Sequence, residues 1–258
     1  MIRLRKLGEI SSFRGMWNNR RISIVLLQDA FQEGIFDILA EVKRQPWIDE
    51  TILVQWNFSP QTVAAPESVG VAIPVSGMVG DAWLAGMKRA SGDYIILMRA
   101  DGSYMAKDVQ KFFVYTDDFD MILGTRTSKE MIWRGADLWS VLRIGNELAA
   151  KFLQYLFGGP SITDVGSEFR LIKRRVLNRL LPEIRTKNTT FFLEMMILGF
   201  IEEVRIVEVP VNYRARLGKP RPEDQWNAMV PEVLKKIVVV WWYRILFLFR
   251  RPGGEYDE

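Results

Sequence analysis

The sequence predicts an α/β fold in which a mostly parallel sheet is flanked by helices. Short apolar runs rich in β-branched residues alternate with stretches whose apolar side chains recur every three to four residues, which is the pattern of strands connected by helices. A chain of 258 residues with 48% hydrophobic and 26% charged residues has the composition of a globular protein and can bury one sizeable core. We therefore expect one large domain followed by a tail.

The expected elements follow this alternation along the chain. In the first half we expect strands at Ile22–Leu27, Thr51–Val54, Val69–Ile73, Tyr94–Met98 and Met121–Gly124. Helices are expected between them at Gly34–Gln45, Gly80–Ala90 and Lys107–Tyr115. For the second half we expect a long helix at Leu138–Phe157, a strand at Glu168–Ile172, helices from Arg174 and at Phe191–Gly199, and a last strand pair near Arg205–Tyr213.

The composition excludes several classes of chemistry. The chain has no Cys and no His, so it can form neither a disulfide nor a thiolate, and it lacks the usual general base and the commonest transition-metal ligand. Serine-hydrolase triads with His, Cys/His zinc sites and thiol enzymes are therefore excluded. Carboxylates, hydroxyls, Lys and Arg remain, which suits reactions in which a hard metal ion or a cation neutralises an oxyanion, as in phosphate chemistry.

The C-terminal part of the chain is both basic and apolar. Residues 205–251 contain ten Lys and Arg against four Asp and Glu, a local balance of +6 in a chain whose net charge is +4. Within this part, Ile237–Phe249 is apolar except for Arg244, and Lys235–Lys236 and Arg250–Arg251 bracket it. As a helix it would be about 20 Å long, against a hydrocarbon core of about 30 Å. Its basic flanks and its Trp and Tyr residues favour the headgroup region of an anionic membrane over nucleic acid. Packing on the domain's own core and contact with a transmembrane subunit are the alternatives.

A carboxylate follows the apolar strand that begins after Gly92–Asp93. Asp101 comes at the carboxyl end of this strand, which is where open α/β sheets bind ligands. It is therefore placed to meet a diphosphate through a divalent cation. An Asp after a strand is as often a turn former or a helix cap, so this alternative stays open.

Several motifs occur in an order that resembles one family. Between residues 80 and 126 they are Ala82–Gly86 on a helix, Gly92–Tyr94 at the start of a strand, Ala100–Asp101 at its end, and Asp120–Arg126. Downstream they are Arg143 and Asn146 in the long helix, Thr163–Arg170, Phe192 with Glu194, and Val207–Arg214. Over about residues 20–218 this order resembles family 2 glycosyltransferases of the dolichol-phosphate mannosyltransferase type.

The resemblance implies a GT-A fold, a nucleotide-sugar donor, a polyprenyl (dolichyl-type) phosphate acceptor, and inversion at the anomeric carbon. An acceptor phosphate is already anionic near neutral pH, so it needs positioning by cations rather than a strong base. By resemblance the acceptor phosphate or a loop over the diphosphate would involve Arg126, Arg143, Asn146, Arg214, Arg216 and Lys219. A salt bridge or a solvated face is the alternative for each Arg. An internal ion-pair network is an equal alternative for Asp164, Arg170 and Glu194.

The donor half departs from the family's pattern. Residues 25–33 replace the usual Pro-x-Tyr-Asn-Glu, and residues 55–59 replace an Asp-Asp-Gly-Ser pattern, so the carboxylate that would read the base is absent. Ser76 and Met78 replace the Asn and the first Gly that open the helix. Trp56 or Phe58 could stack on a base instead. The remaining candidates for donor binding are Gln55, Asn57, Gly80, Asp101 and Ser103.

Arg99 stands where the family has the first acid of its Asp-x-Asp metal motif. A Mg²⁺ or Mn²⁺ ion would keep Asp101 as its motif ligand, but Arg99 would repel it. In one hypothesis the guanidinium itself neutralises the leaving diphosphate, and Arg99, Asp101, Arg126 and Arg143 form a metal-independent catalytic set. In the other, Arg99 pairs permanently with Asp101, and the domain is a degenerate relative used for binding or assembly at a membrane.

The chain is thus expected to have three parts: a basic tail (1–20), a GT-A-like domain (21–218) and a membrane-associating helix with an acidic end (219–258). The expected partners are a nucleotide sugar, a polyprenyl or dolichyl phosphate, and a membrane surface or a transmembrane subunit, with no nucleic acid. The expected location is peripheral, on the cytoplasmic face of a membrane. A nucleotidyltransferase on a similar sheet is a weaker alternative, because the downstream Arg motifs would have no purpose in it. We expect Arg99 and Asp101 to face a cleft whose opposite wall carries Arg126 and Arg143.

Overall fold

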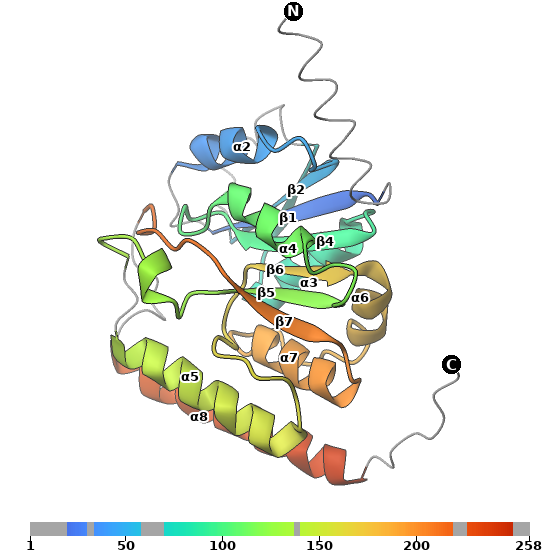
Figure 1. Cartoon of the computed structure of the whole chain (residues 1–258), viewed down its shortest axis with the longest axis vertical. Coiled ribbons are helices and arrows are strands. Elements are labelled where there is room, and N and C mark those ends of the chain that lie inside the picture. Colours follow the sequence, from blue (N-terminus) through green and yellow to red (C-terminus); the bar gives the residue numbers. More distant parts are fainter. Residues whose placement is uncertain (1–19, 30–33, 58–69, 137–139, 219–225, 250–258) are drawn as a thin grey trace, which may run out of the picture.

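The chain forms a seven-stranded sheet covered by helices (Figure 1). The computed structural model describes residues 20–29, 34–57, 70–136, 140–218 and 226–249. The strands are β1 (Ile22–Asp29), β2 (Glu50–Trp56), β3 (Val71–Val75), β4 (Tyr94–Arg99), β5 (Met121–Thr125), β6 (Arg170–Lys173) and β7 (Ile206–Pro210). Their order in the sheet is β3-β2-β1-β4-β6-β5-β7.

Most neighbouring strands are parallel, as the sequence predicts. The exception is β6, which runs antiparallel to both β4 and β5 and lies between them. Because β4 and β5 therefore point the same way, the carboxyl ends of β1, β2, β4 and β5 lie at one edge of the sheet. Every residue of β1, β4 and β5 is buried, as expected for parallel strands covered on both faces.

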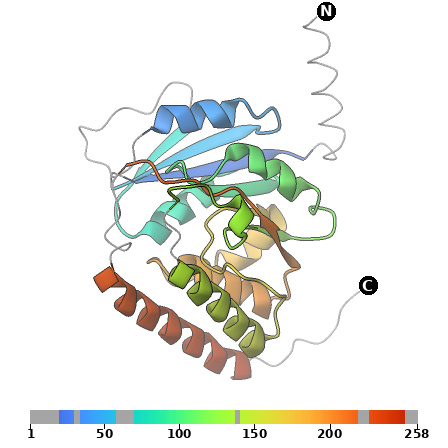
Figure 2. The ribbon, with the colours of Figure 1, turned by 60° about the vertical axis from the view of Figure 1, so that its left-hand side comes forward.

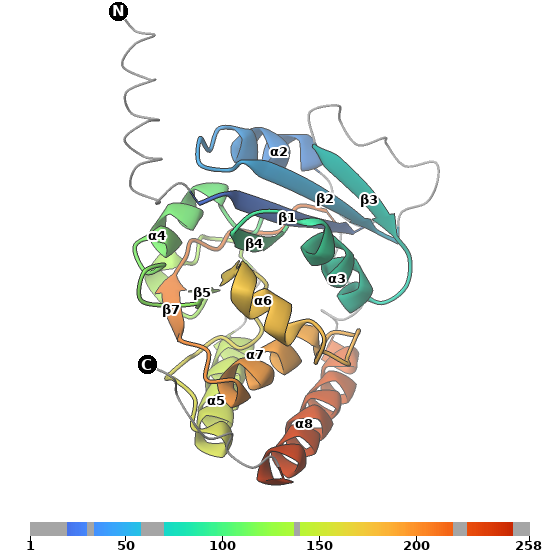
Figure 3. The ribbon, with the colours of Figure 1, turned by 90° about the vertical axis from the view of Figure 1, so that its right-hand side faces the viewer.

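Helices cover both faces of this sheet (Figure 3). One face packs against α2 (Ile35–Lys43) and against the short pair η1 (Ala106–Asp108) and α4 (Val109–Phe113). The other face packs against α3 (Val79–Arg89), α6 (Arg174–Leu180) and α7 (Phe191–Ile201). Each of these groups of helices closes its own hydrophobic cluster, so the sheet lies between two cores.

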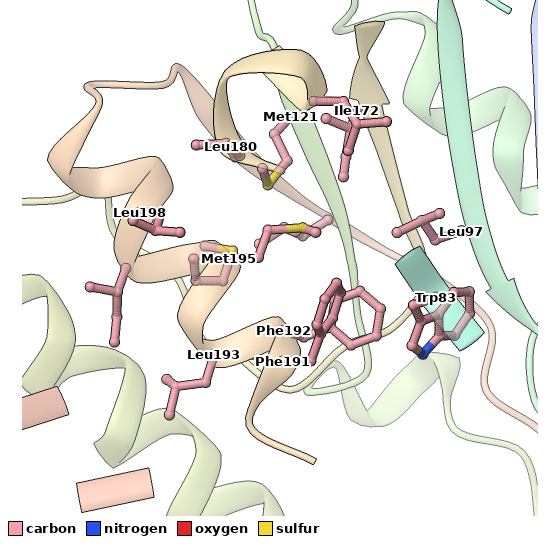
Figure 4. Packing of buried hydrophobic residues seen from close by; sticks show 14 of the residues in the cluster. Trp83, Leu97, Met121, Ile172, Leu180, Phe191, Phe192, Leu193, Met195 and Leu198 are labelled. Carbon is pink, nitrogen blue, oxygen red and sulfur yellow. The ribbon is translucent and has the colours of Figure 1, made fainter. Parts of the chain in front are cut away.

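The helix α7 is the centre of the larger core (Figure 4). Its residues 191–200 are all buried, and Phe191, Phe192 and Met195 point toward Trp83 of α3 and toward the sheet. The rings of Phe192 and Trp83 meet edge to face, with their centroids 5.2 Å apart. A helix that is apolar on all sides is stable only when other elements bury it on all sides. Besides the sheet, the helices α3, α5 (Ser140–Phe157) and α8 (Trp226–Phe249) cover α7.

The C-terminal helix α8 is longer than the apolar stretch that predicts it. It lies against α5 and α7 (Figures 1 and 2), and its Val240 and Tyr243 are buried in the larger core. On its outer side Val238, Trp241 and Trp242 are more than half exposed. Packing on the domain's own core is thus real, yet it leaves an apolar face uncovered. Within the part of the chain that the structure describes, no helix combines the length and the apolar character that crossing a membrane requires.

Several expected strand bounds differ from the observed ones by one or two residues; the strand expected at Glu168–Ile172, for example, begins two residues before β6. We expected Val69–Ile73, but β3 covers Val71–Val75 and includes Pro74; as an edge strand it tolerates a residue without an N–H. The last strand pair near Arg205–Tyr213 is wrong, because only β7 forms there. Among the described residues after Pro210, β-type pairing consists of isolated bridges from Tyr213 to Tyr104 and Ile132. The tail expected at residues 1–20 lies outside the described residues except for Arg20.

Candidate active site

The carboxyl ends of β1 and β4 bring Asp29 and Arg99 together. In the parallel pairing of the two strands Leu27 lies opposite Arg99, the last residue of β4, and Asp29 is the last residue of β1. Nη1 of Arg99 lies 3.3 Å from Oδ2 of Asp29, and both side chains are only 2% exposed. The site is therefore built on residues whose positions the register of the sheet fixes.

A second carboxylate holds Arg99 more tightly. Nε and Nη2 of Arg99 both donate to the carboxylate of Glu168, with an Nη2–Oε1 distance of 2.5 Å. This two-point geometry is the strongest form of Arg–carboxylate pair. Although burial alone would lower the pKa of Arg99, attraction to Glu168, Asp101 and Asp29 raises it, so the guanidinium is permanently charged. The hypothesis that Arg99 pairs with Asp101 needs correction, because its contacting partners are Glu168 and Asp29.

Asp101 lies in a tight turn just after β4. Its Oδ1 accepts hydrogen bonds from the backbone N of Ser103, at 3.0 Å, and from the Ser103 hydroxyl. Gly102 between them has a φ of 75°, which a residue with a side chain rarely adopts. The turn-forming alternative for Asp101 is thus correct, and Ser103 serves the same turn. The other carboxylate oxygen, Oδ2, lies 3.7 Å from Nε of Arg216.

The segment from Tyr213 to Gly218 lies over this turn. Its backbone N–H groups at Arg214 and Leu217 donate to the carbonyls of Ser103 and Asp101, both at 2.8 Å. Nε of Arg214 reaches the Gly102 carbonyl at 3.2 Å, and its Nη2 pairs with Glu41 at 3.1 Å. The structure therefore brings Arg214 and Arg216 to Asp101, as a loop over the diphosphate site requires, while Lys219 lies outside the described residues. Their contact with substrate stays a prediction.

Arg126, at the end of β5, forms an internal ion pair. Its Nε and Nη2 donate to the two oxygens of Asp164 at 2.7 and 2.8 Å, and its guanidinium lies over the Tyr213 ring at 5.6 Å from the centroid. Burial opposes it, but attraction to Asp164 raises the pKa of Arg126, and the same pairing lowers the pKa of Asp164 against the effect of burial. Glu208 fixes Asp164 in turn by accepting its backbone N–H at 2.7 Å. An acceptor phosphate would have to compete with Asp164 for this guanidinium.

The proposed opposite wall of a cleft is only partly visible. Arg143 and Asn146 belong to α5, but their side chains lie outside the described part of the chain. Their contact with the acceptor phosphate stays a prediction, as does the cleft between Arg99 and Arg143.

Asp164, Arg170 and Glu194 do not form one network. Asp164 pairs with Arg126, whereas the fully buried Arg170 donates to the Ser167 carbonyl and lies over the Phe192 ring at 4.3 Å from the centroid. Burial lowers the pKa of Arg170 to about 9, against attraction from the carboxylates of Asp164 and Glu168.

Glu194 serves a different part of the fold. It accepts the backbone N–H groups of Arg185 and Thr186 at 2.9 and 2.7 Å, and the hydroxyl of Tyr243 donates to it. The buried Glu194 thereby ties the loop before α7 to the C-terminal helix α8.

The residues expected to bind the donor have structural partners. The backbone N–H of Gly77 donates to Asn57 Oδ1 at 3.1 Å, and Trp56 Nε1 donates to the Gly77 carbonyl at 2.9 Å. Gln55 Nε2 lies 3.5 Å from Gln28 Oε1. Gly80 is needed for a close backbone approach, because a Cβ there would come 2.6 Å from Cα of Lys187. Donor binding by Gln55, Asn57 and Gly80, and stacking on Trp56, stay predictions, while Phe58 lies outside the described residues.

The residues at this edge do not fit a divalent cation. Oδ2 of Asp101 lies 3.7 Å from Nε of Arg216, its Oδ1 accepts the backbone N–H of Ser103, and the positive charge of Arg99 also acts on this carboxylate. Nowhere in the described ranges do three or more Asp or Glu side chains gather so that they could hold a metal ion. The other two acids at these strand ends, Asp29 and Glu168, already form ion pairs with Arg99.

Sequence reasoning missed Asp29, Glu168 and Glu208 as parts of the site. A signal was present, since a buried strand that ends in Arg requires carboxylate partners from elsewhere in the chain. Asp29 ends the neighbouring strand, and Glu168 stands inside the motif Thr163–Arg170.

The sheet order and the polar residues at its carboxyl edge define an α/β domain of the GT-A type. Residues 74–181 match the family profile described as Glycosyl transferase family 2. The predicted resemblance to family 2 glycosyltransferases and the predicted fold are thereby confirmed. Solved structures of the glucosyl-3-phosphoglycerate synthase of Mycobacterium tuberculosis share this fold. Its complex with Mn²⁺, UDP and phosphoglyceric acid is 17% identical, with a TM-score of 0.67, and the match covers 90% of this chain and 82% of that one. Its complex with Mg²⁺ and UDP is 16% identical, with a TM-score of 0.68, over 90% and 83%.

The chain is also similar in sequence to two relatives that are named as sugar transferases. The low-salt glycan biosynthesis hexosyltransferase Agl6 of Haloferax volcanii is 28% identical over 170 residues, which are 64% of this chain and 40% of that protein. The UDP-N-acetylglucosamine–dolichyl-phosphate N-acetylglucosaminyltransferase of Methanococcus voltae is 27% identical over 138 residues, 52% of this chain and 54% of that protein. The chain thus matches only about half or less of the length of these relatives.

Proposed function

We propose that this chain transfers a sugar from a nucleotide sugar to a polyprenyl or dolichyl phosphate, with inversion at the anomeric carbon. The observation that carries the proposal is the gathering of Arg99, Asp101 and the Arg214–Arg216 segment at the carboxyl edge, in a chain whose residues 74–181 match Glycosyl transferase family 2. The relative from Methanococcus voltae, which is named for a dolichyl-phosphate acceptor, supports the same class of acceptor here.

The reaction balances without a protein base. An oxygen of the ionised acceptor phosphate forms a bond to the anomeric carbon, and the bond from that carbon to the donor's diphosphate oxygen breaks. The electron pair of that bond leaves with the diphosphate, so no proton has to be removed from the acceptor. The protein's task is to position two anions and to stabilise the charge on the leaving diphosphate, which Arg side chains do well. This agrees with a chain that has no His and no Cys.

We further propose that the protein acts at the cytoplasmic face of a membrane as a peripheral protein. The exposed apolar side chains of α8, which are Ile237, Val238, Trp241, Trp242, Ile245 and Leu246, support this position. Lys235, Lys236 and Arg244 lie on the same helix, and cationic side chains beside Trp suit an anionic headgroup region. A transmembrane partner subunit that covers the same face is the alternative occupant.

The test is a transfer assay with the full chain, polyprenyl phosphate in anionic vesicles and a panel of radiolabelled nucleotide sugars. We expect label to move from the aqueous phase into the lipid extract with at least one donor. Vesicles without the polyprenyl phosphate are the control for non-specific carry-over. Absence of transfer with every donor and with both Mg²⁺ and Mn²⁺ would contradict the proposal.

The degenerate scaffold is the second candidate, and a specific observation favours it. Arg99 and Arg126, two of the cations meant for the anionic substrates, are neutralised by Glu168 and Asp164. Calorimetry separates the candidates, since a scaffold without catalysis is expected to show no measurable affinity for any nucleotide sugar. Binding of a nucleotide sugar in the micromolar range would instead favour the transferase.

A further inference from the structure

We propose that the Arg99 guanidinium, clamped by Glu168 and Asp29, takes the place of a divalent cation at the carboxyl edge. The chain would then handle the donor diphosphate without binding Mg²⁺ or Mn²⁺. This inference rests on the proposed transferase function for its catalytic consequence, but its central claim about metal binding is independent of activity. It assigns roles to Glu168 and Asp29 as positioning residues.

The first support is the construction of the clamp. Arg99 reaches Glu168 through Nε and Nη2 and Asp29 through Nη1, so bonds to the two carboxylates fix the plane of its guanidinium. Arg99 and Asp29 are both 2% exposed. A cation held in this way has a fixed position, as a bound metal ion has, and it cannot dissociate.

The second support is electrostatic. Asp29, Asp101 and Glu168 would place three negative charges at an edge that has to accept a diphosphate. Arg99 and Arg216 supply two positive charges among them, since Asp101 attracts Arg99 and lies 3.7 Å from Nε of Arg216. The five side chains together carry one net negative charge instead of three. A divalent ion performs the same neutralisation in a metal-dependent site.

The positive charges already at this site would repel a second cation. An added Mn²⁺ at Asp101 would lie near the Arg216 guanidinium, whose Nε is 3.7 Å from Oδ2 of Asp101, and the charge of the buried Arg99 acts on the same carboxylate, so both cations would repel the ion. Its only ligands from the motif would be Asp101 and Ser103, and their contact with each other already holds the turn.

The division of labour between the two arginines follows from exposure. Arg99 is too deeply buried to leave its clamp and meet a substrate directly, so its role is to cancel carboxylate charge. Arg216 is 28% exposed and belongs to the segment over the turn, so it is the cation that can turn toward a phosphate.

The decisive experiment measures Mn²⁺ binding directly. Mn²⁺ is titrated into the full chain with saturating UDP, and free Mn²⁺ is followed by electron paramagnetic resonance, with UDP alone as the blank. We expect wild type to bind no Mn²⁺ beyond the blank. The double variant Arg99→Asp/Glu168→Ser restores an acid at the motif position and removes the clamp, and we expect it to bind Mn²⁺ at least tenfold more tightly than wild type.

The matched control is Arg175→Gln, which changes an exposed Arg at the opposite edge of the sheet and should bind no Mn²⁺. Thermal unfolding confirms that each variant is folded. Micromolar Mn²⁺ binding by wild type overturns the inference. A folded double variant that gains no Mn²⁺ binding also overturns it.

Activity gives a second readout that separates this inference from the proposed function. We expect transfer to persist in excess EDTA. Glu168→Gln should lower kcat at least tenfold with a smaller change in KM for the donor, and Glu168→Asp should restore part of the loss by re-forming the ion pair. Transfer that EDTA abolishes refutes the inference and leaves the function intact. No transfer under any condition, together with the expected Mn²⁺ results, refutes the function and leaves the inference intact.

Discussion

Two charge clusters lie at opposite ends of the strands of the sheet, and they are built in opposite ways. At the carboxyl edge one cation, Arg99, lies between Glu168 and Asp29. At the amino edge one carboxylate, Asp120, receives Lys173, Arg175 and Arg205 at 3.0, 2.5 and 3.1 Å.

The two clusters differ most in their exposure to solvent. Arg99 is 2% exposed, whereas the side chains of Arg175 and Arg205 are 66% and 53% exposed. Water and salt can replace an exposed partner, but nothing replaces a buried one, so the loss of one ion pair should have very different consequences in the two clusters. The buried cluster around Arg99 therefore cannot compensate for a lost partner. A site that holds charges in fixed positions requires this kind of rigidity.

The largest effect is expected from Arg99→Ala. The substitution leaves Asp29 and Glu168 facing each other without their cation, and removing one partner of a buried ion pair costs about 3–5 kcal/mol of unfolding free energy. Chemical denaturation at neutral pH measures it. The double variant Arg99→Ala/Glu168→Ala should recover part of the loss, because it removes one of the two stranded charges. A cost under about 1 kcal/mol would show that the clamp is not buried in solution.

An intermediate effect is expected from Arg126→Gln. Asp164, which is 1% exposed, loses two charge-assisted hydrogen bonds but keeps the backbone N–H of Arg126 at 3.1 Å, so we expect a loss of about 2–3 kcal/mol. Denaturation of this variant beside Arg99→Ala gives the ranking. If both variants lost the same unfolding free energy, the number of carboxylates left without a cation would not determine the size of the loss.

The sequence predicted the sheet well because the strands that build it are buried on both faces. β1, β4 and β5 are uninterrupted apolar runs, and such runs identify themselves without knowledge of their neighbours. The edge strand β3 was misplaced by two residues because its alternating burial gives a weaker pattern. The sequence also placed Asp101 and Arg99 correctly at the end of a strand, since that follows from local order alone.

The partners of these residues could not be predicted, because they depend on which strand ends meet. Glu168 reaches Arg99 across a separation of 69 residues, and this follows from the antiparallel insertion of β6 between β4 and β5. No periodic pattern reports such an insertion. The same holds for α8, where the apolar stretch predicted a helix but gave no sign that Tyr243 would donate to the buried Glu194 of α7.

The smallest effect is expected from Arg175→Gln in the Asp120 cluster, and it should depend on pH. Although burial opposes it, hydrogen bonds from Arg205, Arg175 and Lys173 lower the pKa of Asp120 well below its ordinary value. A carboxylate with a lowered folded pKa stabilises the fold above the unfolded pKa of about 3.9, and this contribution is lost as the pH falls through the folded value.

The substitution should therefore cost under about 1 kcal/mol near neutral pH, because Lys173 and Arg205 remain. Since the unfolded pKa of Asp120 is the same in both proteins, the difference should persist below about pH 4 and shrink only as the pH falls toward the lowered folded pKa. Urea denaturation of both proteins at several pH values between about 2 and 7 measures it, and added salt should reduce the difference at neutral pH. A loss as large as that of Arg99→Ala would contradict the comparison, since it would mean that exposed and buried clusters respond alike.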